Sequence, residues 1–395
     1  MVARAPIALV STPRSAWAGE EVFGLGDSLG EARILDKPLH LWRPLDRLVE
    51  AEVGATVAGP LLLWGRDLWV SPAMLAAFES AAAALGAAGP VRLSRAASGP
   101  AGLSDPLGRL TRSEDGGEIH YDLWYLPAGQ RVTLQSPDRW PEALERAQGL
   151  DVGGRVFKVE IDVDLTVSET GKMEISFSKV AAAPVGHWVE LARANLLAIG
   201  AEALEPGLLR GGVSLLWAIV RAMSLNPSKV LQKITRRGKG CWIHPSAVVE
   251  GCRLGDNVKV DACAVLRGCV LGDGVKVGPL STAEFSVFGA GAELQRHAFA
   301  NLSVIYPGAR IGGALQLAVA GRDCRHKFGA IGTDMNPNGP VRVVGPDGLT
   351  MVDIGYQGVC LGHGSFVGAN LTIMPGRRIE EGRVVASPSR IFIRK

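Results

Sequence analysis

A heptapeptide that returns along the chain at a constant short interval is the feature that most constrains the fold. Its first copy is Leu254–Val260 (LGDNVKV) and its second is Leu271–Val277 (LGDGVKV). A looser copy, Phe288–Leu294 (FGAGAEL), begins after the same interval again. A period this short excludes helical repeat arrays, whose units are about 33 to 47 residues long. It fits one turn of a β-helix, in which each coil lays three short strands on three flat walls.

Apolar or small side chains recur with the same period. The nine positions are Ile243, Val249, Leu254, Val260, Leu266, Leu271, Val277, Ala283 and Phe288. Within a coil the steps are six, five and six residues, so this is a hexapeptide repeat that lacks one residue per turn. Near the C-terminus every step is six residues, at Leu361, Val367, Ile373, Ile379, Val385 and Ile391. We expect these side chains to point inward and to stack on their equivalents in neighbouring coils.

Clusters of glycine, aspartate and asparagine lie between these columns. Gly255–Asn257 and Gly272–Gly274 are examples, and such residues favour the tight corners that a β-helix needs. A glycine-rich all-β domain with chance periodicity is the alternative, and the repeated heptapeptide argues against it.

The chain length of 395 residues allows two to three domains. Residues 1–185 mix apolar strands such as Ile7–Val10 with an alanine-rich helix at Pro72–Leu85, which predicts an α/β domain. Residues 186–240 form a helical connector, which we expect to link the two domains and to cap the open first coil. The β-helix occupies residues 241–395.

The segment at about 336–356 breaks the hexapeptide phase. Prolines and glycines punctuate it around a strand-like stretch, Val341–Val344. We expect a loop or hairpin ejected from the coils, and loops of about 20 residues in a compact fold are usually functional.

Composition narrows the partners and the compartment. A net charge of +3 with 21% charged residues does not indicate a basic surface for binding nucleic acid. No apolar run reaches the ~18 residues of a transmembrane segment, and the N-terminus does not resemble a signal peptide. We therefore expect a cytoplasmic protein with reduced cysteines, in which Cys252 and Cys269 stack one coil apart.

The order of α/β domain, helical connector and β-helix resembles a known fusion family. In that family a sugar-1-phosphate nucleotidyltransferase is joined to a hexapeptide-repeat acyltransferase, and the best-known bacterial members are bifunctional and form UDP-N-acetylglucosamine. Ile243–Val249 resembles the usual opening of the family's β-helix, Gly329–Asn336 its glycine-threonine-asparagine loop and Ala369–Gly376 its late coils. Arg33–Leu39 resembles a Gly-Lys-Pro-Leu-like stretch of its first half. The resemblance implies a left-handed parallel β-helix, and we expect a homotrimer because flat walls bury little surface alone.

The N-terminal half departs from this family. A nucleotidyltransferase needs a glycine-rich loop with an arginine after its first strand, to bind the triphosphate on backbone N–H groups. Here Pro13 and Trp17 stand where glycines are expected, although Arg14 remains. We therefore predict a degenerate nucleotidyltransferase-like domain. Asp162 and Asp164 would hold Mg²⁺ only if the domain is active, and solvent-facing acids of a strand explain them equally well.

Acyl transfer requires a general base, which is usually a histidine. His297 follows the third repeat copy and resembles the family's catalytic histidine, although the spacing to the later loop is a few residues longer. Arg296 beside it suits a substrate phosphate or carboxylate. An exposed corner histidine without a role is the alternative.

Further candidates follow along the coils. A basic segment suits the phosphates of CoA or a nucleotide, or is an exposed loop without a ligand; it contains Arg322, Arg325, His326 and Lys327. Asp334 and Asn336 would hydrogen-bond sugar hydroxyls, and Asn336 before a proline is equally a turn starter. His363, between glycines, is a second candidate base at the subunit seam.

The resulting hypothesis is acyl- or acetyl-CoA-dependent transfer to a sugar or nucleotide sugar. His297 acts as base, Asn336 orients the acceptor, and a backbone N–H at a corner stabilises the oxyanion. Two alternatives stay open: a catalytically silent scaffold or regulatory subunit, and a residual sugar-1-phosphate nucleotidyltransferase. A zinc site made by His297, His326 and His363 is disfavoured, because no two of them have the local spacing of ligands on one coil.

Overall fold

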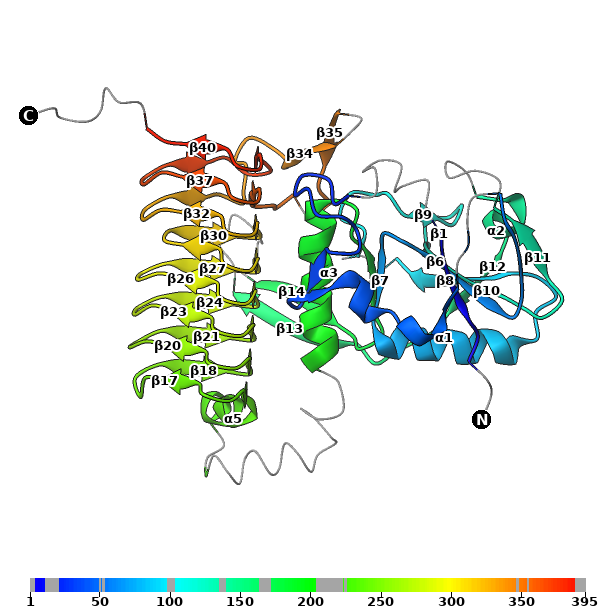
Figure 1. Ribbon diagram of the computed structural model, residues 1–395, viewed down its shortest axis with the longest axis horizontal. Coiled ribbons are helices and arrows are strands. Elements are labelled where there is room, and N and C mark those ends of the chain that lie inside the picture. The colour runs from blue at the N-terminus through cyan, green and yellow to red at the C-terminus, as the bar shows by residue number, and fades with distance from the viewer. Residues whose placement is uncertain are drawn as a thin grey trace, which may run out of the picture.

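The computed structural model shows two bodies lying side by side, with helix α3 (Trp188–Ala203) between them (Figure 1). The structure describes residues 4–10, 21–49, 51, 54–97, 104–134, 140–162, 172–203, 223, 226–345, 348–353 and 355–387. None of the helices in these ranges is long and apolar enough to cross a membrane.

The N-terminal body is built on a mixed sheet, in the order β12-β8-β10-β6-β1-β4, with β9 paired to β10. Strands β4 and β6 run parallel to β1, whereas β10 is antiparallel to β6 and β8. Their bounds are β1 Ile7–Val10, β4 Leu48–Val49, β6 Leu61–Gly65, β8 Val91–Ala96, β9 Thr111–Arg112, β10 Glu118–Leu126 and β12 Gln148–Asp151. The sequence therefore predicted an α/β layer correctly, and its kinship to nucleotidyltransferases stays a prediction.

Helix α1 (Pro72–Leu85) has the predicted bounds because both ends are signalled locally. The Ser71 hydroxyl accepts the N–H of Met74, Pro72 occupies the first turn, and Gly86 ends the helix in the left-handed region. Smaller elements complete the domain: β2 Arg33–Ile34, β3 Lys37–Pro38, η2 Leu39–Trp42, η3 Leu45–Arg47, β5 Thr56–Ala58, β7 Leu68–Val70, β11 Arg131–Thr133, α2 Glu142–Glu145, β13 Phe157–Asp162, β14 Lys172–Phe177 and β15 Ala182–Pro184.

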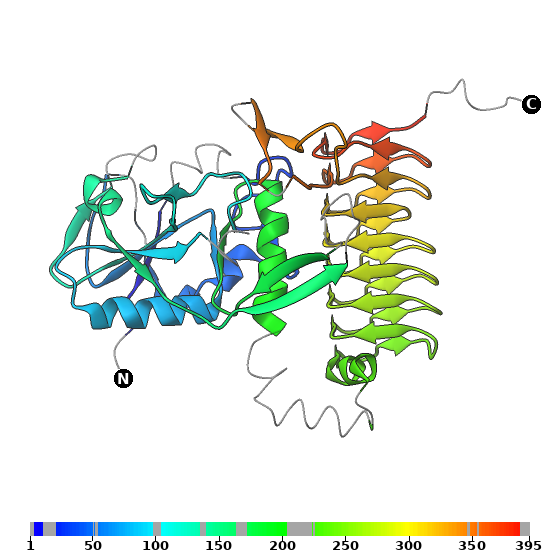
Figure 2. The same cartoon turned by 180° about the vertical axis from the view of Figure 1, so that it is seen from behind.

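The C-terminal body is a parallel β-solenoid with three walls (Figure 2). Wall 1 contains β16 Arg236–Arg237, β19 Arg253–Leu254, β22 Val270–Leu271, β25 Val287–Phe288, β28 Val304–Ile305, β31 Val319–Ala320, β36 Cys360–Leu361 and β39 Arg378–Ile379. Wall 2 contains β17 Trp242–Ile243, β20 Lys259–Val260, β23 Lys276–Val277, β26 Glu293–Leu294, β29 Arg310–Ile311, β32 Arg325–His326, β37 Phe366–Val367 and β40 Val384–Val385. Wall 3 contains β18 Val248–Glu250, β21 Val265–Arg267, β24 Thr282–Glu284, β27 Phe299–Asn301, β30 Ala314–Gln316, β33 Ile331–Gly332 and β38 Thr372–Ile373.

The strand register confirms the predicted columns. Leu254 pairs with Leu271 and Leu271 with Phe288, which is the interval of the repeated heptapeptide. Val260, Leu266 and Ala283 are fully buried in the same interior cluster. Near the C-terminus the step is one residue longer, since Leu361 pairs with Ile379 and Val367 with Val385. Ile391 lies outside the described residues.

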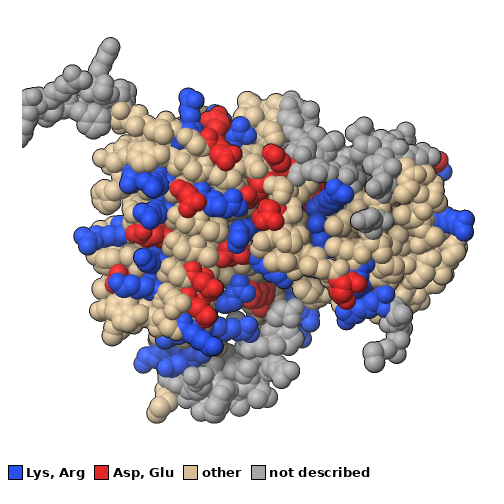
Figure 3. Space-filling view, in the orientation of Figure 1, with Lys and Arg blue, Asp and Glu red and all other residues tan. Residues whose placement is uncertain are grey.

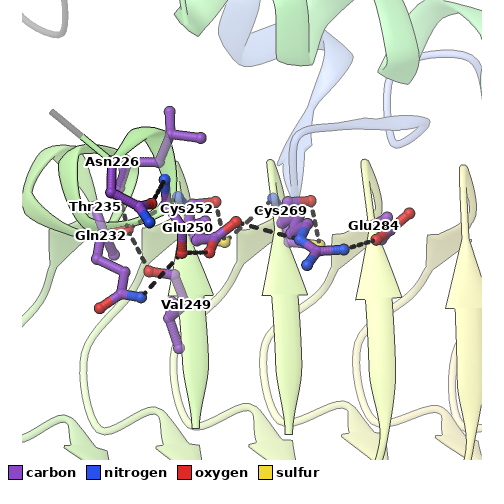
Figure 4. A network of polar contacts seen from close by, with 11 residues as sticks. Asn226, Gln232, Thr235, Val249, Glu250, Cys252, Cys269 and Glu284 are labelled. Atoms are coloured by element: carbon purple, nitrogen blue, oxygen red, sulfur yellow. Dashed lines mark hydrogen bonds and ion pairs between the residues drawn. The ribbon is translucent and has the colours of Figure 1, made fainter. Parts of the chain in front are cut away.

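Helix α5 (Pro227–Ile234) caps the first coil (Figure 4). The Thr235 hydroxyl donates to the carbonyl of Val249 at 3.1 Å, and Ser228 Oγ donates to Glu250. Glu250 continues into an ion-pair ladder along wall 3, with Arg267 at 3.2 Å and then Glu284 at 2.8 Å from Arg267. Most of the predicted helical connector after α3, residues 204–225, lies outside the described residues except for Met223.

The N-terminal domain covers wall 1. The outward side chains along this wall are apolar and buried at Val270, Val287, Val304, Val319 and Cys360. They share one core cluster with Trp69, Trp188 and Leu191. On wall 2 half of the matching outward positions are exposed lysines and arginines: Lys259, Lys276, Arg310 and Arg325. Figure 3 shows basic and acidic side chains interspersed over one face of the solenoid. The domain therefore docks along the side of the solenoid.

The chain leaves the walls after β33 and folds into an antiparallel hairpin, β34 (Arg342–Gly345) and β35 (Gly348–Met351), before it returns at β36. Residues of this excursion pack on the chain's own N-terminal domain, because Val343 and Val352 belong to the same buried cluster as Trp188.

Candidate functional site

The residues predicted from the sequence fall at three different corners of the solenoid. We name the corners by the walls that they join: corner 1/2, corner 2/3 and corner 3/1. Arg296, His297 and Lys327 follow wall 2 and belong to corner 2/3, with Arg325 on wall 2 beside it. Asp334 and Asn336 follow wall 3, and Arg322 and His363 follow wall 1. One chain therefore does not unite the predicted set.

His297 occupies an exposed left-handed position at corner 2/3, with φ 58°. Cys263 and Leu280 hold the equivalent position in the two preceding coils, with φ 55° and 59°. Leu280 is 53% exposed, and Phe328, later on the same corner, is 64% exposed. His297 is thus presented outward from a surface with large apolar side chains.

The corner is shorter in the coil that follows His297. Only Gly312 and Gly313 separate β29 from β30, whereas four residues separate β26 from β27. A Cβ atom on Gly313 would overlap the carbonyl oxygen of Ala330, so the close approach of the coils requires glycine here.

His326 does not face a surface ligand, in contrast to the prediction. It pairs with Ile311 and Val367 in the inward column of wall 2 and is 1% exposed. Neither ring nitrogen has a hydrogen-bond partner among the residues that the structure describes, and burial lowers the pKa of the imidazole to about 4. A neutral, enclosed imidazole cannot bind the phosphate of CoA, so we remove His326 from the candidate site.

His363 is engaged on both ring nitrogens at corner 1/2. Nδ1 accepts the backbone N–H of Arg322 at 2.7 Å, and Nε2 donates to Asp27 Oδ1 at 2.9 Å. Arg322 Nη2 also lies 3.1 Å from that oxygen. Burial alone would raise the pKa of Asp27, but the hydrogen bond from His363, followed by the charge of Arg322, holds it below its usual value. These residues hold the N-terminal domain on the solenoid. His363 is therefore not the free base at a subunit seam that the sequence suggested.

A groove of about 410 Å³ lies at corner 3/1, between the ejected loop and the last coils. Its polar lining is two amides and two guanidinium groups: Asn336, Asn338, Arg342 and Arg377. Its apolar lining includes Leu349 and Met374, both more than half exposed. Of these lining residues the sequence predicted only Asn336. Arg342, Arg377 and Met374 come together only because the ejected loop folds back onto the last coils.

The neighbouring polar groups are held by local bonds. Asn336 Oδ1 accepts the N–H of Asn338 at 3.2 Å, which is the turn considered from the sequence. Asp334 accepts a hydrogen bond from Gln316 Nε2 at 2.8 Å, and burial raises the pKa of its carboxyl. A Cβ on Gly376 would overlap the carbonyl oxygen of Arg342, so this glycine lets β34 lie on the last coil.

The groove suits a ligand with an anionic group beside an apolar portion. Guanidinium groups bind phosphate and carboxylate through paired N–H donors, and Leu349 and Met374 offer apolar contact. Its lining, as the structure describes it, includes no imidazole and no carboxylate. A general base for acyl transfer would therefore have to come from outside this lining.

The candidate metal ligands lie apart from one another or outside the described residues. No group of three or more histidine, cysteine, aspartate or glutamate side chains is placed to hold a metal ion there. His297, His326 and His363 lie at corner 2/3, in the interior and at corner 1/2, so they form no zinc site within one chain. Asp162 ends β13 with a side chain that is not described, and Asp164, Arg14 and the loop around it lie outside the described residues.

Comparisons with known proteins leave the activity open. No family model matches the chain, and no curated protein matches it. Among solved structures, it is similar to the acetyltransferase domain of PglB from Neisseria gonorrhoeae FA1090, at 23% identity and a TM-score of 0.18. The match covers 39% of this chain and 54% of that one.

Proposed function

We propose that this chain is an acyl-CoA-dependent transferase whose acceptor is a sugar or nucleotide sugar, and that the groove at corner 3/1 binds the acyl donor. The observation that carries the proposal is the pairing of Arg342 and Arg377 with apolar side chains in one groove on a hexapeptide solenoid. The arginines would bind the phosphates of acetyl- or acyl-CoA, the apolar lining would contact the pantetheine arm, and Asn336 would orient the acceptor. We expect the winding to be left-handed.

The catalytic base of this proposal is His297 of a neighbouring subunit. Within one chain, β27, which follows His297, lies three strand steps along wall 3 from β38 at the groove. At about 4.8 Å per step this is roughly 14 Å along the axis, and the two sites also lie at opposite edges of the wall.

A homotrimer would bring the two corners together. Wall 1 is already covered by the chain's own domain, so walls 2 and 3 remain for subunit contacts. Wall 3 has apolar outward residues, including Val265, Phe299 and Ile331, and adjoins both corner 2/3 and corner 3/1. Packing through this wall would place corner 2/3 of one chain beside corner 3/1 of the next. The offset of roughly 14 Å along the axis would remain, and the bound acyl donor would have to span it.

The reaction would be direct acyl transfer. Nε2 or Nδ1 of His297 takes the proton of the acceptor hydroxyl or amine as that atom attacks the thioester carbonyl. A backbone N–H at a corner stabilises the oxyanion, the C–S bond breaks, and the CoA thiolate receives the proton from His297.

The second candidate is a catalytically silent scaffold or regulatory subunit. The absence of a base among the described groove residues favours it, since a groove that only binds needs none.

An assay of free CoA released from acetyl- and longer acyl-CoA, with a panel of sugars and nucleotide sugars as acceptors, distinguishes the two candidate functions. Only the transferase should release CoA. We expect His297→Ala to lose about 100-fold or more of the turnover, with the trimer intact by light scattering. His244→Ala is the matched control, because His244 is a half-buried histidine in the first coil whose imidazole hydrogen-bonds to Ser246 among the described residues. Turnover that survives in His297→Ala contradicts this base, and no turnover with any acceptor favours the scaffold.

A further inference from the structure

The hairpin that lines the groove is held by the N-terminal domain and by helix α3. His187 Nε2 donates to the carbonyl oxygen of Val344 at 3.2 Å, and the N–H of Asp353 donates to the carbonyl oxygen of Pro106 at 2.9 Å. Arg193 Nη2 donates to the carbonyl oxygen of Tyr356 at 3.3 Å. The contacts are thus spread from the first hairpin strand to the point where the chain returns to the coils.

Both positioning side chains are buried in the seam between the domains. Arg193 is 3% exposed, and His187 is fully buried and stacked on Phe23, with ring centroids 5.5 Å apart. His187 Nδ1 accepts the N–H of Val189 at 3.2 Å, which leaves Nε2 as the donor to the hairpin. Burial lowers the pKa of His187 to about 3, so this donor remains neutral across the ordinary pH range.

Strand β34 transmits these contacts directly to the groove. Successive residues of a strand face opposite sides, and here Val343 is buried in the interdomain core whereas Arg342 faces the groove. Val341, at the base of the strand, also lines the groove. A displacement of Val343 from the core would therefore move Arg342.

We infer that the α/β domain and the helix α3 packed on it keep the groove in its binding shape, with Arg193 and His187 as positioning residues. The ligand of the groove rests on the proposed function, whereas the mechanical link to the hairpin does not. The α/β domain thus has a role in the chain as support for the groove, whether or not it has an activity of its own.

The test compares Arg193→Met and Arg193→Lys in the full chain. Methionine keeps much of the aliphatic volume and removes the donors, whereas lysine keeps the charge and one donor. The matched control is Arg92→Met, which removes a buried arginine of the N-terminal sheet, ion-paired to Asp122 at 2.7 Å and remote from the hairpin contacts above. Hydrogen exchange of hairpin peptides 341–352 is measured alongside the KM and kcat for acetyl-CoA.

We expect Arg193→Met to raise hairpin exchange about tenfold or more and to raise the KM by a similar factor with kcat little changed. Arg193→Lys should keep hairpin exchange and the KM close to the parent values. Arg92→Met should lower the melting temperature without altering hairpin exchange. Unchanged hairpin exchange in Arg193→Met, or equal loosening in Arg92→Met, overturns the inference. If the parent protein has no turnover, the proposed function fails while hairpin exchange still decides this inference.

Discussion

The carboxylate of Asp36 accepts a hydrogen bond from the backbone N–H of Ala290 at 2.9 Å, although 254 residues separate them. Corner 1/2 contains an aspartate ladder in which Asp256 accepts the N–H of Lys239 at 2.6 Å and Asp273 accepts that of Asp256 at 2.7 Å. Two coils beyond Asp273, where Ala290 would find its acceptor, the chain has Pro307. The N-terminal domain supplies the acceptor that the solenoid lacks.

Asp36→Ala should weaken the docking of the two domains. It leaves the Ala290 N–H without its partner and removes the ion pair of Asp36 with Arg33, whose Nη1 lies 2.6 Å from Oδ1. We expect a loss of about 1–3 kcal/mol in the free energy of unfolding, measured in urea. Asp36→Asn is the control, because its amide oxygen still accepts.

The pH dependence of these variants separates charge from hydrogen bonding. Burial raises the pKa of Asp36 above 3.8, so its contribution is fully present below pH 3.8 and is lost as the pH rises through the folded pKa. Asp36→Asn should therefore be at least as stable as the parent at pH 7. A large loss in Asp36→Asn would contradict this account.

His326→Leu should reduce the acid sensitivity of the solenoid. The folded pKa of about 4 lies below the ordinary value of 6.5, so the parent loses stability as the pH falls from 6.5 to 4, by about 3 kcal/mol from this group. Leucine fits the aliphatic column and removes two unpartnered nitrogens, so the variant should be no less stable at pH 7. Urea unfolding at pH 7 and pH 4.5 checks this, with His244→Leu as the control at a half-buried histidine. An unchanged difference between the two pH values would contradict a buried neutral imidazole.

The cap at α5 predicts unequal effects of two glutamates on wall 3. Glu250 is 6% exposed and bonds to both Ser228 and Arg267, whereas Glu284 is half-buried and pairs with an exposed part of Arg267 (Figure 4). Glu250→Ala should cost about 1–3 kcal/mol and Glu284→Ala less than about 1 kcal/mol. Equal losses in thermal unfolding would argue against α5 as the cap of the first coil.

Gly376→Ala should disturb the groove, whereas Gly382→Ala should not. Both glycines have positive φ values, 71° and 63°, so both substitutions carry similar backbone strain. Only at Gly376 would the new Cβ collide with the Arg342 carbonyl; at Gly382 there is open space. We expect weaker CoA binding and faster hairpin exchange in Gly376→Ala alone, and equal effects in both variants would refute a contact role for Gly376.

The columns of the solenoid were predictable because stacking imposes one residue type at a fixed period. The prediction of these columns failed where the repeat period changed. The coil between β29 and β32 is two residues shorter than the coils before it, so His326 was not recognised as a member of the column that contains Ile311. It was taken for a surface group because its neighbours Arg325 and Lys327 are basic.

The docking of the N-terminal domain on wall 1 was missed, although the sequence contains its signal. Wall 1 strands repeat two adjacent apolar residues, as in Val270–Leu271 and Val287–Phe288, whereas wall 2 strands pair a charge with an apolar residue, as in Lys259–Val260. Two apolar neighbours in a strand mean burial on both faces. The groove was less accessible to prediction, since Arg342 and Arg377 are brought together by a hairpin whose position depends on the other domain.

Titration of CoA and acetyl-CoA into the full chain by calorimetry tests the central claim most directly. Saturable binding that weakens about tenfold or more in Arg342→Ala and Arg377→Ala, but not in Lys276→Ala on wall 2, is the predicted result. Binding that is unaffected by both groove substitutions, or no binding by the parent protein, would contradict the assignment of the groove as the acyl-donor site.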